Sequence, residues 1–285
     1  MSHFIENKNL KIQVENTGAE LVSLYSKEAD TEYLWYGKKE IWGKHAPILF
    51  PIVGKLIDDK YRVNGKEYTL EKHGFARNTE FKLIDKGEDF IKFCLTENEE
   101  TLKKYPYKFN LIITYTLKGK TLEVTHEVVN TNDDTMYFSL GGHPAFNCEI
   151  GDILEFEKEE TLAAEKIHIE NALLLPNKFP LLDNEKEIVI TKDIFAEDAL
   201  ILSGFKSDYV TLKSPNHDRT VKVTLGGAPY LGIWAKPGAP YVCIEPWFGV
   251  NDSPEVKNDI SEKNQIVKLE KGKTFTFTWT ATVSH

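Results

Sequence analysis

Arginine is scarce in this 285-residue sequence, although lysine is abundant. The 35 basic residues include only three arginines, Arg62, Arg77 and Arg219, and the 44 acidic residues give a formal net charge of −9. Proteins that bind nucleic acid usually carry basic patches interleaved with aromatic residues, and no such run occurs here. The composition therefore argues against a nucleic-acid partner.

The sequence also has few cysteines and no long hydrophobic run. The three cysteines, Cys94, Cys148 and Cys243, are odd in number and widely spaced, which is typical of reduced thiols and not of a disulfide framework. No stretch approaches the ~20 apolar residues that span a bilayer. The opening residues MSHFIENKNL contain neither the apolar core nor the cleavage site of a signal peptide. We therefore expect a cytoplasmic protein that does not enter a membrane.

The sequence lacks the motifs that bind common cofactors. None of the 8 histidines falls in an H-x-H or H-E-x-x-H pattern, and no C-x-x-C pair occurs, so no zinc motif is present. Neither a G-x-G-x-x-G segment nor a Walker A loop is found. We expect a protein that uses no metal and no cofactor.

Short alternating segments separated by turn residues dominate instead. Asn64 and Gly65 lie within YRVNGKEYTL, the pattern of a tight β-hairpin, and similar hairpin patterns recur over 81–95 and 110–130. Residues 274–283 alternate strictly between threonine and apolar side chains, as in a half-buried antiparallel strand.

Helix signals are few, since only 97–107 and 191–200 favour one or two helical turns. No long repeat and no linker interrupts the strand pattern. The sequence predicts an all-β fold, formed as a single large antiparallel β-sandwich domain over residues 1–285.

One histidine stands in an unusual segment, SLGGHPAFN, at residues 139–147. Two glycines before His143 allow the backbone to approach a neighbour closely, and the proline after it ends sheet pairing. Histidine has the ordinary pKa nearest neutrality, which suits a general acid. A histidine that merely fills a turn is equally compatible with the local sequence.

A partner base is supplied by the segment YVCIEPWFG. Glu245 follows the apolar strand 241–244 and precedes Pro246 and Trp247. A carboxylate in a cleft beside an aromatic ring has a perturbed pKa and suits a general base. The alternative is an ordinary glutamate at a strand end in solvent.

Further polar and aromatic residues accompany these two segments. The loop KHGFARN carries His73 and Arg77, and the loop ILFPIVGKL carries Lys55. The guanidinium fork of arginine suits carboxylate, phosphate or paired hydroxyls. Trp234 and Trp247 lie beside polar loops, where aromatic rings can stack on the apolar face of a sugar. Phe75 and Phe146 lie beside the same motifs. Taken singly, each of these four aromatic residues is better explained as part of the core, but together they indicate a small-molecule pocket.

These segments together resemble the aldose 1-epimerase (galactose mutarotase-like) family. VVNTNDDTMYFSLGGHPAFN is similar to the histidine segment of that family, and CIEPWFG is similar to its glutamate segment. GKLIDDKYRVNGKEYTL matches the spacing of a segment that begins with a substrate-binding basic residue and leads to a histidine–glycine pair. The resemblance spans most of the chain, and HGFAR is closest to the branch of LacX-type proteins and hexose-6-phosphate epimerases.

The resemblance implies a β-supersandwich that interconverts the α and β anomers of a sugar without a metal or cofactor. Glu245 would take the proton of the C1 hydroxyl, and His143 would protonate the ring oxygen. His73 and Asp198 would bind sugar hydroxyls. Lys55 stands where the family usually has arginine, which changes how hydroxyls can be held.

Other interpretations stay open at this stage. Arg77 would help to hold a phosphate if the substrate were a hexose 6-phosphate, although a free hexose is favoured. A non-catalytic sugar-binding protein on the same fold is a second possibility. A glycoside hydrolase is a third, with Glu245 and Asp198 as its two carboxylates. We expect a monomer or a homodimer, and the identity of the sugar is open.

Overall fold

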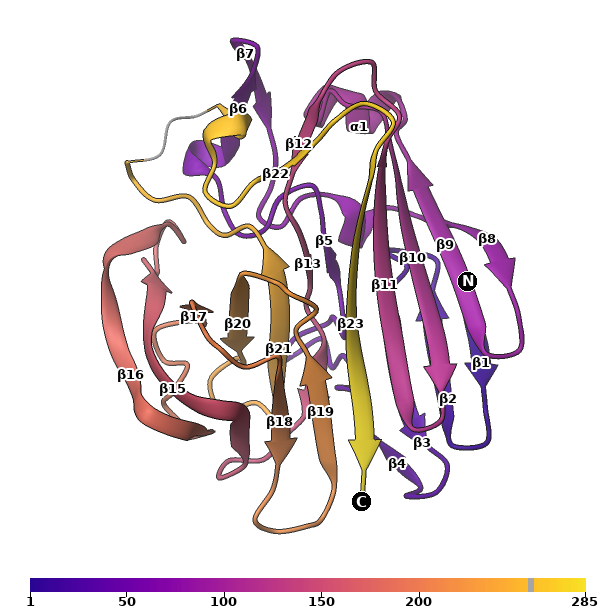
Figure 1. Cartoon of the computed structure of the whole chain (residues 1–285), viewed down its shortest axis with the longest axis vertical. Coiled ribbons are helices and arrows are strands. Elements are labelled where there is room, and N and C mark those ends of the chain that lie inside the picture. Colours follow the sequence, from indigo (N-terminus) through magenta and orange to yellow (C-terminus); the bar gives the residue numbers. More distant parts are fainter. Residues whose placement is uncertain (256–258) are drawn as a thin grey trace.

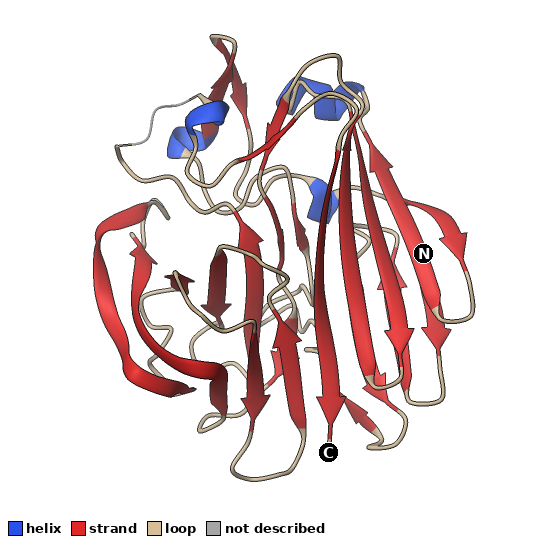
Figure 2. Cartoon of the chain, viewed as in Figure 1, coloured by secondary structure: helices blue, strands red, loops and turns tan. Residues whose placement is uncertain are grey.

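Antiparallel strands form nearly all of the regular structure in the computed structural model, which describes residues 1–255 and 259–285 (Figures 1 and 2). Every pairing between named strands in these ranges is antiparallel. The all-β prediction is thus confirmed. No helix of the described residues is both long and apolar enough to cross a membrane.

The smaller of the two main sheets is formed near the N-terminus by four consecutive strands, in the order in which they occur in the chain. They are β1 (Ser2–Glu6), β2 (Leu10–Glu15), β3 (Leu21–Ser26) and β4 (Thr31–Glu32).

The larger sheet is wound so that strands far apart in sequence become neighbours. Its order is β5 (Ile48–Leu49), β13 (Leu140–Gly142), β21 (Tyr241–Phe248), β20 (Tyr230–Trp234), β17 (Leu200–Ser203), β15 (Ile153–Ile167), β18 (Tyr209–Lys213), β19 (Thr220–Thr224), β23 (Thr274–Ser284), β11 (Thr121–Asn130), β10 (Phe109–Lys118), β9 (Phe90–Thr96) and β8 (Lys82–Lys86). Beside this path, β14 (Ala145–Asn147) pairs with β21, and β16 (Leu174–Val189) pairs with β15.

Two short ribbons and a few helical turns complete the described structure. The ribbons are β6 (Lys60–Val63) with β7 (Lys66–Thr69), and β12 (Met136–Phe138) with β22 (Val267–Leu269). The 3₁₀ turns are η1 (Ile57–Asp59), η2 (Ala76–Asn78) and η3 (Ile260–Glu262), and the one α-helix of these ranges is α1 (Glu99–Lys104).

The hairpins expected from the sequence are present. β6 and β7 are joined through Asn64 and Gly65, whose φ angles of 51° and 79° lie in the left-handed region that a tight hairpin turn requires. β8 pairs with β9 and β10 pairs with β11, which confirms the other two hairpins. In β23, Phe277, Trp279, Ala281 and Val283 are buried and the threonines that alternate with them are not, so the alternation is also confirmed.

One of the two helix predictions is correct. α1 lies within 97–107, and the side chain of Asn98 accepts hydrogen bonds from the backbone N–H groups of Glu100 and Thr101 at its first turn. The helix expected over 191–200 is wrong, because this segment forms turns that lead into β17. Asp198 adopts a φ of 73° there, which a right-handed helix cannot accommodate.

One continuous hydrophobic cluster, from Ile5 to Val283, joins the two main sheets. The ring of His3 in β1 lies 5.5 Å from the ring of Phe93 in β9. The hydroxyl of Tyr115 in β10 donates a hydrogen bond of 2.6 Å to the carbonyl of Ala19, between β2 and β3. The N-terminal sheet therefore packs on the β8–β11 part of the larger sheet and leaves the region around β21, β20 and β17 free to form a site (Figure 1).

Candidate functional site

The predicted site residues, Lys55 excepted, line one cavity of about 160 Å³. β21 contributes Glu245 and Trp247, β20 contributes Trp234, and the neighbouring loops contribute the rest. The full lining consists of Trp42, Lys72, His73, Arg77, His143, Ile167, Asp198, Ala199, Ile201, Trp234, Glu245, Trp247 and Asn251. The two segments singled out by sequence, around His143 and Glu245, thus meet in one place.

Strand register brings His143 to Glu245. β13 pairs with β21 through Gly141 and Trp247, and β14 pairs with the same strand through Ala145 and Cys243. His143 lies at the break between β13 and β14, so this register places it across from Glu245. Nε2 of His143 lies 3.2 Å from Oε2 of Glu245.

The two glycines before His143 make room for tryptophan rings. A Cβ atom on Gly141 would lie 2.6 Å from Cδ1 of Trp247, and one on Gly142 would lie 2.8 Å from Nε1 of Trp279. Neither glycine has a φ in the left-handed region, so close packing explains them better than backbone freedom does. Their small size lets β13 pair with β21 while the indole rings of Trp247 and Trp279 lie against β13.

The carboxyl group of Glu245 is only 1% exposed. Burial raises its pKa well above the ordinary value, because a buried carboxylate loses its hydration. The Nε1–H group of Trp247, which donates a hydrogen bond of 3.2 Å to Oε2, and the positive charge of Lys72 partly oppose this rise, while Asp198 adds to it. Once ionised, such a carboxylate is a stronger base than a glutamate in water.

His143 is held between aromatic rings. The ring of Trp42 stacks on it with centroids 5.1 Å apart, and Trp234 meets it edge-on at 5.9 Å. Burial, together with the nearby positive charges of Lys72 and Arg77, lowers the pKa of His143 to about 3. The imidazole is therefore neutral near pH 7, and its protonated form is a strong acid.

His73 offers a fixed hydrogen-bond donor to the cavity. It has a φ of 67° and is followed by Gly74 with a φ of 69°, a tight turn that seats the ring against the loop at Gly54. The backbone N–H of Gly54 donates to Nδ1 of His73 over 3.1 Å. Burial lowers the pKa of His73 well below its usual value, so the ring is neutral and carries its proton on Nε2.

The cations Lys72 and Arg77 and the carboxylate of Asp198 also line the cavity. Arg77 donates from its NH2 group to the carbonyl of Lys72 over 2.8 Å, which fixes the guanidinium at the cavity wall. Its buried Nε atom has no hydrogen-bond partner among the residues described. Asp198 accepts a hydrogen bond of 2.7 Å from the N–H of Ala199, so one carboxylate oxygen is anchored to the backbone.

Lys55 differs from the expectation, because it does not line this cavity. Its ammonium group forms an ion pair with Asp59, one helical turn further along the chain. The ammonium group that does line the cavity belongs to Lys72, which directly precedes His73. The match of Lys55 to a basic residue of the family predicted a basic group in the cavity, and Lys55 does not supply it.

Sequence reasoning also missed Trp42 and Asn251. Trp42 is one of only 5 tryptophans, and it precedes Gly43 in a polar stretch, which was an available signal. Asn251 follows the glutamate segment, and its side-chain amide donates to the carbonyl of Ala172 over 2.7 Å. Phe75 and Phe146, which flank the predicted motifs, are core residues instead.

Cys243 lies close to His143 and Glu245. The potential ligand atoms of His143, Cys243 and Glu245 lie within 4.8 Å of one another. Burial raises the pKa of the Cys243 thiol and of the Glu245 carboxyl group, and both groups would have to lose their protons to bind a metal. Binding a metal ion to the trio would therefore require two deprotonations in a buried site.

The sequence matches the family described as Aldose 1-epimerase over residues 1–281. The chain belongs to the aldose 1-epimerase family. Protein LacX (chromosomal) from Lactococcus lactis subsp. lactis, a curated relative, is 34% identical over 280 residues, which cover 93% of each chain. The resemblance to the LacX branch of this family is thus confirmed.

Solved structures of similar proteins have the same fold. The galactose mutarotase related enzyme from Lactobacillus acidophilus superposes with a TM-score of 0.95 at 36% identity, covering 100% of this chain and 98% of that one. A galactose mutarotase-like protein from Lactobacillus casei ATCC 334 gives a TM-score of 0.91 at 31% identity, with 100% of both chains covered. The galactose mutarotase-like supersandwich predicted from sequence is therefore confirmed.

Proposed function

We propose that this protein is an aldose 1-epimerase that interconverts the α and β anomers of a hexose, with Glu245 as base and His143 as acid. The observation that carries the proposal is the contact of 3.2 Å between Nε2 of His143 and Oε2 of Glu245 at the wall of a cavity lined by tryptophans. A protein that only binds sugar has no need for a buried acid–base pair.

The reaction requires two proton transfers and one bond cleavage. Glu245 takes the proton from the C1 hydroxyl as His143 protonates the ring oxygen, and the bond between C1 and the ring oxygen breaks. Rotation about C1–C2 then turns the aldehyde, and the reverse transfers close the ring on the other face. One positioned acid or base typically contributes ~10²–10⁴-fold, and holding the sugar between the two adds more.

His143 and Glu245 share a single proton. Burial favours the neutral forms, with the proton on Glu245 and a neutral His143. Moving that proton across the 3.2 Å contact gives the carboxylate and imidazolium that start the reaction. The positive charge of Lys72 stabilises the carboxylate. The pair can therefore reach its reactive form without taking a proton from solvent.

The remaining lining suits a sugar in this position. Trp234 and Trp42 present aromatic rings, which pack well on the apolar face of a hexose. His73 supplies a neutral N–H donor and Asp198 supplies acceptors for hydroxyl groups.

Polarimetry tests the proposal directly. The optical rotation of freshly dissolved α-D-glucose and α-D-galactose would be followed with and without the protein. We expect faster mutarotation of at least one sugar. If neither sugar nor its 6-phosphate responds although binding is measured, the protein is a non-catalytic sugar-binding member of the fold.

A phosphorylated substrate is the second candidate, because both Arg77 and Lys72 line the cavity and Nε of Arg77 has no hydrogen-bond partner among the described residues. Arginine binds phosphate through several donors at once. Arg77→Ala should then lower kcat/KM for a hexose 6-phosphate far more than for the free hexose, whereas Arg62→Ala should change neither. Equal losses on both substrates would remove the phosphate role.

A further inference from the structure

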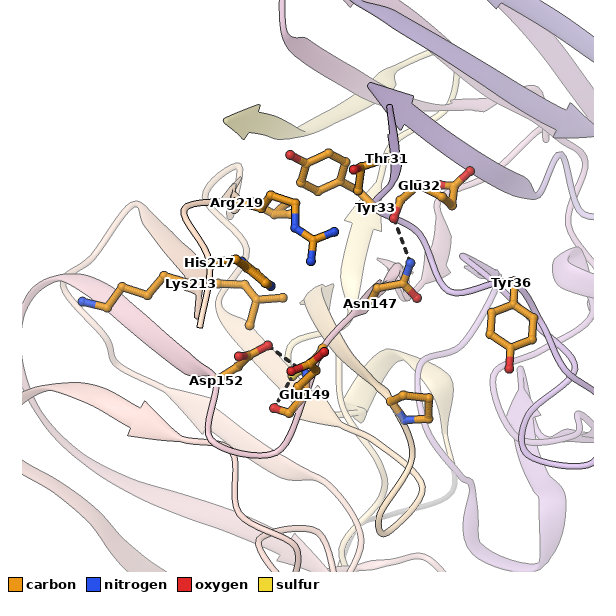
Figure 3. Close-up of a pocket in the computed structure, with 14 residues that line it drawn as sticks. Thr31, Glu32, Tyr33, Tyr36, Asn147, Glu149, Asp152, Lys213, His217 and Arg219 are labelled. Carbon is orange, nitrogen blue, oxygen red and sulfur yellow. Dashed lines mark hydrogen bonds between the residues drawn. The ribbon is translucent and has the colours of Figure 1, made fainter. Parts of the chain in front are cut away.

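A second cavity, away from His143, opens between the edge of the small sheet, β14 and the turn that joins β18 to β19 (Figure 3). Its volume is about 220 Å³, compared with about 160 Å³ for the cavity at Glu245, so it can hold a molecule of at least the same size. Tyr36, Asn147, Asp152, His217 and Arg219 are among the residues that line it, and none of them lines the first cavity.

Arg219 is the main cationic group of this second cavity. Its guanidinium reaches toward the space between His217 and Asn147 (Figure 3). It makes no hydrogen bond and no ion pair within residues 1–255 and 259–285, although arginine offers five N–H donors. The neighbouring cation, Lys213, is already paired with Glu155 and Glu187.

Uncommitted hydrogen-bonding atoms surround that guanidinium. Nδ1 of His217 is buried and has no hydrogen-bond partner in the described structure. The side-chain amide of Asn147 donates to the carbonyls of Glu32 at 2.9 Å and Leu34 at 3.0 Å, which fixes the group and leaves its carbonyl oxygen as an acceptor. The cavity lining therefore offers the donors of Arg219 together with hydrogen-bonding atoms of His217 and Asn147.

The charges of the lining argue against a simple anion as the ligand. Glu149 and Asp152 also line the cavity, so an inorganic phosphate beside Arg219 would face two carboxylates. A neutral ligand with several hydroxyl groups meets no such repulsion. Each hydroxyl can donate to a carboxylate and accept from the guanidinium.

Apolar groups also line the second cavity. Tyr36 has 59% of its surface exposed, and the cavity is also bordered by Pro240 and Val221. An exposed aromatic ring beside polar groups suits the mixed apolar and hydroxylated faces of a sugar ring. We propose that the second cavity binds a neutral saccharide at a site distinct from the acid–base pair.

Because the chain has only three arginines, their NMR signals can be followed separately. In ¹⁵N-labelled protein, the three arginine Nε–H signals report on three places: Arg77 on the first cavity, Arg219 on the second, and Arg62, which lines neither, on the rest of the surface. D-galactose, D-glucose and lactose would be titrated separately, with sodium acetate and inorganic phosphate as anionic probes.

We expect at least one sugar to shift the Arg219 signal along a saturating curve, while Arg62 stays unchanged. Movement of Arg219 with acetate or phosphate but with none of the sugars would overturn the proposal in favour of an anion site. A signal that no probe moves would also overturn it.

A pair of variants assigns the site. Arg219→Ala should abolish the sugar-induced shift of the Asn147 side-chain amide, and Arg62→Ala should preserve it. Both variants should keep the mutarotation rate of the unmodified protein, because neither residue lines the first cavity. Preservation of the Asn147 shift in Arg219→Ala would contradict the assignment.

Discussion

The Nε2 atom of His143 lies 3.2 Å from the Oε2 atom of Glu245, across a break in the strand that faces β21. Pro144 follows the histidine, and sheet pairing resumes at Ala145. The glycine–glycine–histidine–proline segment thus does two things. It allows close approach to β21, and it leaves one side chain free of the sheet to meet a buried carboxylate.

Trp247→Phe should shift the pH dependence of the reaction. The variant removes the N–H group that donates to Oε2 of Glu245 and opposes the rise in its pKa. A hydrogen bond to a charged group is worth ~1.5–3 kcal/mol, or about one to two pH units. The limb of the kcat/KM profile on which the pair loses its shared proton should therefore move to higher pH by about that amount.

Trp279→Phe is the matched control. Nε1 of Trp279 is buried without a hydrogen-bond partner in the described structure, so its removal breaks no contact with the carboxylate. Its pH profile should coincide with that of the unmodified protein. An unchanged profile in Trp247→Phe would show that this hydrogen bond does not set the pKa of the base.

Gly141→Ala should impair catalysis. The added Cβ would lie 2.6 Å from Cδ1 of Trp247, so the indole or the strand must shift beside Glu245. Displacing an oriented catalytic group by about 1 Å can cost ~10²-fold in rate. The measurement is kcat/KM together with the urea unfolding midpoint.

Gly43→Ala serves as the control, because its Cβ would lie 3.4 Å from the nearest atom, which is ordinary contact. That variant should match the unmodified protein in both rate and midpoint. Full activity in a folded Gly141→Ala protein would mean that Trp247 does not need its present position.

His126→Leu should reduce the sensitivity of folding to acid. The imidazole is fully buried and stacks on Phe277 with ring centroids 5.3 Å apart, and burial lowers its pKa to about 3. Below pH 6.5 the unfolded chain protonates this residue and the folded chain does not, so stability falls as the pH is lowered toward 3. Between pH 7 and pH 5 this single group contributes a loss on the order of 2 kcal/mol.

The free energy of unfolding in urea, measured at pH 7 and at pH 5, tests this for both proteins. His73 and His143 also have lowered pKa values, but they are present in both proteins and cancel in the comparison. Equal pH dependence with and without His126 would contradict the assignment of a low pKa.

The strands and most residues of the first cavity could be predicted from local sequence, but Trp42, Lys72 and Asn251 were not. Asn64-Gly65 and the alternation in 274–283 are short-range signals that the fold preserves. Lys55 follows Gly54 and Lys72 precedes His73 and Gly74, but only Lys72 lines the cavity, and Lys55 forms an ion pair with Asp59. Whether Lys55 reaches Asp59 or the cavity depends on the direction of its side chain, which residue spacing does not reveal.

The second cavity had no local signature at all. Tyr36, Asn147 and Arg219 come from three distant segments, each of which reads as an ordinary turn or strand end. They converge because β14 pairs with β21 and the turn between β18 and β19 reaches the edge of the small sheet. Sites of this kind depend on sheet order, which a single sequence does not disclose.

The central claim is that Glu245 is the base, and Glu245→Gln tests it most directly. Anomer exchange of the preferred hexose would be measured by NMR magnetisation transfer for this variant and for Glu160→Gln. Glu160 is also buried, but it accepts hydrogen bonds from the backbone of Lys206 and Ser207 and does not line the cavity. We expect Glu245→Gln to fold and to lose ~10²–10⁴-fold in rate, while Glu160→Gln keeps the rate of the unmodified protein and loses only stability. Exchange at the unmodified rate in a folded Glu245→Gln protein would contradict the account.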